Sequence, residues 1–75
     1  MLDSDEIKKK MYSLLKLEGI LLDTEINKLF MENESYEQLG KIGAACYLLT
    51  QENKAERIDF SETRYYMKLK SLTKQ

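Results

Sequence analysis

Residues 39–49 read Leu-Gly-Lys-Ile-Gly-Ala-Ala-Cys-Tyr-Leu-Leu, and this segment determines how the rest of the chain must be arranged. As a helix it is apolar on nearly every side, while Gly40, Gly43 and Ala44 keep one side thin. A helix of that kind belongs between other helices. A chain of 75 residues offers few neighbours, so we expect a partner chain to share in its burial.

The predicted central helix has two distinct faces. One face carries the apolar residues Leu39, Ile42, Ala45, Cys46 and Leu49, and the adjoining face carries Tyr36, Gly40, Gly43 and Tyr47. Glycine inside a helix costs about 0.5–1 kcal/mol relative to alanine, so two glycines indicate close packing. Their neighbour is either the first helix of the same chain or another molecule, and the sequence leaves both open.

Polar residues mark where the central helix begins and ends. Ser35 and Gln38 form a capping pair at its start, and Asn33 suits the left-handed end of a preceding helix. At the other end, Asn53 suggests a stop after about Glu52. We therefore expect a helix from residue 36 to about residue 52.

The N-terminal segment has a helical apolar stripe that begins after a capping pair, Asp3 and Glu6. The stripe comprises Ile7, Met11, Leu14, Leu15, Leu22, Ile26, Leu29 and Phe30. Because its phase is kept throughout, we favour one long or slightly kinked helix from about Asp5 to Glu32. In the alternative, Gly19 ends a first helix and Asp23 caps a second.

The C-terminal segment is predicted as a charged stretch, 53–58, that is a linker or a helical extension, followed by a helix from Phe60 to about Leu72. Asp59 and Glu62 would cap that helix. Residues 65–70 also alternate as in a strand. We favour the helix because a strand would have no obvious partner in this chain. Residues 73–75 are expected to fray.

Composition favours an all-α fold. Proline and valine are absent, and good helix formers dominate. We expect one helical domain over residues 1–75, built as a hairpin or bundle of two long or three to four shorter helices. Cys46 is the single cysteine and histidine is absent, so neither a disulfide nor a zinc site can staple so small a core. A homodimer or a complex with another protein is the remaining source of stability.

The sequence also predicts a soluble, cytoplasmic protein. The chain starts with an acidic segment where a signal peptide would be basic and then apolar. The longest charge-free run, 42–51, has ten residues, whereas about 20 apolar residues are needed to cross a bilayer. The lone thiol suits a reducing compartment.

Catalysis has no visible apparatus in this sequence. There is no histidine, no phosphate-binding glycine loop and no metal-ligand cluster. Cys46 lies in the most apolar segment and is interpreted as a buried small hydrophobe. We therefore expect no enzyme activity, no cofactor and no small-molecule substrate.

Two functional hypotheses follow. The first is a protein-binding module, acting as a regulator, adaptor, inhibitor or co-chaperone through helix–helix packing. Its candidate residues are Tyr36, Gly40, Gly43, Tyr47, Tyr65, Tyr66 and Met67. The alternative is a nucleic-acid-binding transcriptional regulator, in which a basic and aromatic C-terminal helix contributes Arg64, Lys68 and Lys70. A pI of about 5.4 weakens the alternative.

Overall fold

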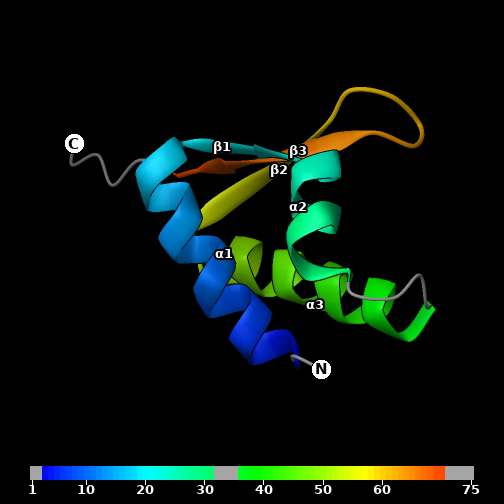
Figure 1. Ribbon diagram of the computed structural model, residues 1–75. Helices are drawn as coiled ribbons and strands as arrows, with labels where there is room; N and C mark the ends of the chain where they lie inside the picture. The colour runs from blue at the N-terminus through cyan, green and yellow to red at the C-terminus, as the bar shows by residue number, and fades with distance from the viewer. Residues whose placement is uncertain (1–2, 32–35, 71–75) are drawn as a thin grey trace, which may run out of the picture.

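The described part of the chain folds into three helices and a three-stranded sheet (Figure 1). The computed structural model describes residues 3–31 and 36–70. Its elements are, in order, α1 (Ser4–Glu18), β1 (Ile20–Leu22), α2 (Asp23–Phe30), α3 (Tyr36–Gln51), β2 (Ala55–Asp59) and β3 (Tyr65–Leu69). The fold is thus α+β, and the all-α prediction is wrong.

The sheet is antiparallel, with β3 between β1 and β2. Met67 stands opposite Leu21 on one side and Arg57 on the other. Met67 and Leu21 are buried against the helices, whereas Lys68 is exposed on the opposite face. Because side chains alternate along a strand, one face of the sheet covers the core and the other faces away from all three helices.

The predicted C-terminal helix is wrong because residues 65–69 do have strand partners. β1 and β2 pair with β3 on its two sides, and both strands come from segments that sequence reasoning assigned to a helix or a linker. Tyr65, Met67 and Leu69 then share the core face. Residues 60–64 form the loop of the β2–β3 hairpin, where the Phe60 amide donates to the Arg64 carbonyl at 3.1 Å. The expected end at Leu72 lies outside the described residues.

The single long N-terminal helix is also wrong, and the alternative with a break at Gly19 is correct. Gly19 has a φ of +85°, and its amide donates to the carbonyl of Leu15 at 2.8 Å. Glycine reaches that conformation without the strain that a side chain brings. The turn lets β1 join the sheet, so the carbonyl of Gly19 accepts from the amide of Leu69 at 2.8 Å.

The helix ends agree in part with prediction. Asp3 caps α1, since its carboxylate accepts from the amide of Glu6 at 2.9 Å. Asn53 has a φ of +60° and follows the end of α3. Asp23 is the first residue of α2 rather than its cap. The predicted roles of Asn33 and Ser35 lie outside the described residues.

A single core joins the helices to the inner face of the sheet. Its buried apolar residues are Ile7, Met11, Leu15, Leu21, Ile26, Phe30, Ile42, Ala45, Cys46, Leu49, Ala55 and Met67. The apolar side of α3 is therefore confirmed except at Leu39, which is 43% exposed. Within the described residues, no helix is both long enough and apolar enough to span a membrane.

Candidate functional site

The outward side of α3 is the strongest candidate surface, and we call Tyr36, Gly40, Gly43, Ala44 and Tyr47 the α3 face. Tyr36 is 92% exposed and Tyr47 is 61% exposed. A Cβ atom added at Gly40 or Gly43 would meet nothing within 4 Å. The first helix of the chain therefore does not pack on these glycines, which excludes that helix as the reason for them.

The first turn of α3 is fixed to α2 by a buried hydrogen bond. The Gln38 side chain, 3% exposed, donates to the carbonyl of Phe30 at 2.9 Å. That carbonyl belongs to the last turn of α2, where no backbone amide of the helix remains to bind it. Five residues, 31–35, join α2 to α3. The bond and the packing of Phe30 in the core hold the two helices as one unit.

The α3 face is almost neutral in charge. Glu37 and Lys41 are the acidic and basic residues of α3, and their side chains pair at 3.9 Å. The remaining surface of the helix is aromatic, small, amide-bearing or, at Leu39, aliphatic. Such a surface can form hydrogen bonds through the tyrosine hydroxyls and permits close approach of a partner over the glycines.

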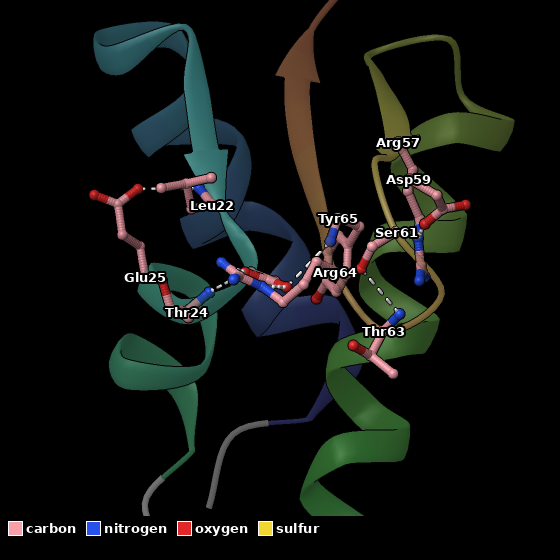
Figure 2. A network of polar contacts seen from close by, with 10 residues as sticks. Leu22, Thr24, Glu25, Arg57, Asp59, Ser61, Thr63, Arg64 and Tyr65 are labelled. Atoms are coloured by element: carbon pink, nitrogen blue, oxygen red, sulfur yellow. Dashed lines mark hydrogen bonds and ion pairs between the residues drawn. The ribbon is translucent and has the colours of Figure 1, made fainter.

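A polar anchor ties the start of α2 to the end of the hairpin loop. Asp23 accepts from Arg64 Nε at 2.8 Å and Nη2 at 3.0 Å, from the amide of Tyr65 at 3.1 Å and from the amide of Thr24 at 2.7 Å. Figure 2 shows Arg64 reaching from the start of β3 towards α2. The hydrogen bond from Arg64 is the main cause that lowers the pKa of Asp23 to about 2.

The residues of the predicted nucleic-acid site do not form one basic patch. Arg64 is held in the anchor with Asp23, whereas Lys68 lies on the outer face of the sheet. The ammonium of Lys70 donates to the side-chain oxygen of Asn53 at 3.2 Å. Since residues 65–69 form a strand, the predicted basic and aromatic helix that would unite them is wrong.

The predicted protein-binding residues separate into three places. Tyr36, Gly40, Gly43 and Tyr47 share the α3 face. Met67 is fully buried, and Tyr65 packs on the core with the Arg57 guanidinium 4.1 Å from its ring centre. Burial raises the pKa of Tyr65 to about 12. Tyr66 belongs to the outer face of the sheet, where its ring lies 6.1 Å from that of Phe60.

Sequence reasoning missed two surface hollows between α1 and α2. Their volumes are about 320 Å³ and 450 Å³, and both are lined by Leu14 and Leu29. Both leucines belong to the predicted helical stripe. Because β1 separates α1 from α2, the two leucines are not enclosed between these helices: Leu29 is 53% exposed, and Leu14 is partly buried against the core.

The described residues contain no group of three histidine, cysteine or carboxylate side chains placed to hold a metal ion. Burial raises the pKa of the Cys46 thiol, which opposes formation of the reactive thiolate. Comparison with known proteins finds no matching family model, no similar curated protein and no similar solved structure.

Proposed function

We propose that this protein binds double-stranded nucleic acid as a helix-turn-helix module, with α3 as the helix that enters the major groove. The observation that carries the proposal is the α2–α3 pair. A short connection joins the helices, their ends are locked together by Gln38 and Phe30, and the outward face of the second helix is open. In helix-turn-helix proteins the second helix contacts the bases with its N-terminal residues, and the first crosses the backbone.

The composition of the α3 face suits entry into a groove. The major groove is about 12 Å wide and admits one α-helix. Gly40, Gly43 and Ala44 add almost no width, so the helix backbone can come close to the groove floor. Tyr36 and Lys41 supply donors for phosphate oxygens.

The hairpin loop gives the proposal a second contact. It joins β2 to β3 beside the N-terminal end of α2 (Figure 1), and the anchor of Asp23 to Arg64 and Tyr65 holds its base to that helix. A helix-turn-helix accompanied by such a hairpin, a winged arrangement, can contact the backbone next to the groove. Thr63 and Ser61 lie in this loop and provide short polar side chains.

The near-neutral charge sets the expected strength of binding. Each phosphate neutralised by a lysine or arginine contributes about 0.9 to the slope of log K against log salt. The basic residue of α3 is Lys41, and that of α2 is the exposed Lys28. Both helices also carry acidic residues. We therefore expect weak binding with a shallow salt dependence.

Fluorescence anisotropy with a labelled duplex of mixed sequence tests the proposal. Binding at low salt is expected, and Gly43→Leu should weaken it at least about tenfold because the added side chain holds the helix away from the groove. Gln51→Leu is the control. It places a leucine at the exposed C-terminal end of α3, and this variant should bind the duplex like the wild type. Absence of duplex binding at low salt would refute the proposal.

Binding of a protein partner on the α3 face is a second candidate function, and the near-neutral charge of that face favours it. Interface cores are enriched in tyrosine and depleted of charged residues. The α3 face has this composition, with Tyr36 and Tyr47 on either side of the glycines. The protein would then act as an adaptor, inhibitor, co-chaperone or regulator, as the sequence suggests, within the cytoplasm. Capture of a host protein that Gly43→Leu abolishes and salt leaves unchanged, with no duplex binding, would favour this function.

A further inference from the structure

The two hollows between α1 and α2 adjoin, and together they form one groove, which we call the helix groove. Leu14 of α1 and Leu29 of α2 line both hollows, so these two leucines are its opposite walls. Leu21 and Phe30 are buried in the core and line one hollow each, so they form its floor. Figure 1 shows α1 and α2 apart, with β1 connecting them at one end. The middle of the groove is therefore apolar.

The two ends of the helix groove differ in charge. Glu18 is the last residue of α1 and Glu25 lies in the first turn of α2, so both carboxylates belong to the end next to β1. Lys28 lines the same hollow, which leaves the acidic residues in excess there. Lys10 lies about two turns before the end of α1 and lines the other hollow, whose described lining contains no acidic residue. The groove thus has an acidic end and a basic end.

These charges are not neutralised by the rest of the described chain. None of the ion pairs between described residues includes Lys10, Glu18 or Lys28. Glu25 accepts from the amide of Leu22 at 3.0 Å, and an amide does not cancel its charge. A partner with a base at one end and an acid at the other would be complementary to the groove, and such complementarity fixes the orientation of a bound partner.

We propose that the helix groove binds an amphipathic helix of another protein. Its apolar side chains lie between Leu14 and Leu29, its basic side chain lies at the β1 end, and its acidic side chain lies beside Lys10. From Lys10 to Glu18 the α1 wall is eight residues long, or about 12 Å at a rise of 1.5 Å per residue. Apolar anchors at i, i+4 and i+7 of a partner helix span about 10 Å. The length of the groove therefore matches two turns of a helix.

The shape and the charges of the groove favour a helix over other ligands. Leu29 and the charged residues at both ends are exposed, so the groove is open on its outer side and covers only one face of what it binds. A small molecule is enclosed on most sides in its pocket, whereas an amphipathic helix has a single apolar face to bury. Glu18 and Glu25 would repel the phosphates of a nucleic acid.

The helix groove is separate from the α3 face. None of the residues that line it belongs to α3, so the inference does not depend on the proposed function. Gly43→Leu, which should weaken binding at the α3 face, should leave binding in the groove unchanged. The two proposals can therefore fail independently of each other.

Selection from a displayed library of helical peptides tests the proposal. The probes are peptides of about 14 residues, or about four helical turns, randomised at the apolar and the charged positions and selected against the full chain. We expect enrichment of peptides with apolar residues at i, i+4 and i+7, a basic residue at one end of that row and an acidic residue at the other. No enrichment, or enrichment of peptides without this charge order, would overturn the proposal.

Fluorescence anisotropy with one enriched peptide then locates the binding site. Leu29→Ser removes one apolar wall and should weaken binding at least about tenfold. Leu39→Ser is the matched control, because Leu39 is a half-exposed leucine of α3 that lines neither hollow. It should bind the peptide like the wild type, and circular dichroism establishes that both variants are folded. Equal binding by Leu29→Ser and the wild type would exclude the groove as the site.

Exchange of charges separates recognition in the groove from an effect on the fold. Glu18→Lys should weaken binding of the enriched peptide and strengthen binding of a second peptide whose basic residue is replaced by glutamate. Lys10→Glu should do the reverse, favouring a third peptide whose acidic residue is replaced by lysine. A disturbed fold weakens every peptide, so only a charge contact exchanges the preference. Loss of all three peptides, or an unchanged preference in both folded variants, would overturn the proposed helix site.

Discussion

Asp23 and Arg64 lie 41 residues apart in the sequence and form a two-point contact, with Arg64 Nε and Nη2 at 2.8 Å and 3.0 Å from the two carboxylate oxygens. The carboxylate is almost completely buried, with 6% of the side chain exposed, and also accepts from two backbone amides. One side chain therefore holds the first turn of α2, the end of the hairpin loop and the start of β3 together.

Asp23 is expected to make the protein sensitive to acid. The hydrogen bond from Arg64 lowers the pKa of Asp23 from 3.8 to about 2 in the folded state. Because the folded pKa is depressed, the stabilisation is fully present above the unfolded pKa, and it is lost as the pH falls from about 4 to about 2. Urea unfolding at a series of pH values should show the midpoint falling through this window.

The variant Asp23→Asn identifies the group responsible. It should lower the urea midpoint near neutral pH, since Arg64 loses its charged partner. It should also flatten the acid dependence, because asparagine does not titrate. Glu52, whose pKa is lowered by Lys8, keeps its own contribution in both proteins. An unchanged acid dependence in Asp23→Asn would show that other carboxylates determine it.

Alanine substitutions at Gly19 and Gly43 should change the stability of the fold in opposite directions. Gly19 has a φ of +85°, so Gly19→Ala should destabilise the fold by about 1–2 kcal/mol. Gly43 lies in a helix with open space around its Cβ position, so Gly43→Ala should stabilise it by about 0.5–1 kcal/mol. Chemical denaturation measures both. A destabilised Gly43→Ala would mean that something packs on that glycine.

Truncation of two leucines in α1 should distinguish the core from the surface. Leu15 is fully buried and Leu17 is 81% exposed. Leu15→Ala should cost about 2–5 kcal/mol of unfolding free energy, since it leaves a cavity. Leu17→Ala should stay within about 0.5 kcal/mol. Equal losses at the two positions, measured by urea unfolding, would contradict the placement of α1.

The link between α2 and α3 is expected to be sensitive at Gln38. Gln38→Ala leaves the buried carbonyl of Phe30 without its side-chain donor, at a cost of about 1–3 kcal/mol. Amide hydrogen exchange should become faster in α2 and in the first turn of α3. Gln51→Ala, at the exposed end of the same helix, is the control and should leave both exchange and stability unchanged.

Local signals in the sequence identified the helix ends that depend on one or two residues. Asp3 and Glu6 mark the start of α1, and the two faces of α3 follow from a period of 3.6 residues. Gly19 was recognised as a break in one of the two alternatives. These features depend on contacts within a few residues, so composition and spacing suffice to predict them.

The sheet was missed because its strands are short and their partners are distant in sequence. β1 has three residues, fewer than a periodic pattern needs, and its Leu22 continues the helical stripe of the flanking segments. β3 shows the alternation of a strand, but its pairing with residues 20–22 and 55–59 is a long-range property. The all-α prediction followed from this, and it misplaced Tyr65, Met67 and Lys68.

The sequence by itself determined that residues 39–49 form an amphipathic helix with a leucine and isoleucine side for the core and a thin tyrosine and glycine side. Only the tertiary structure decided what lies against the thin side: among the described residues, nothing lies within 4 Å of the Cβ positions of Gly40 and Gly43. The reason is topological. The turn at Gly19 sends β1 into the sheet, α1 packs on the apolar side of α3 as part of the core, and the glycine side is left open to another molecule.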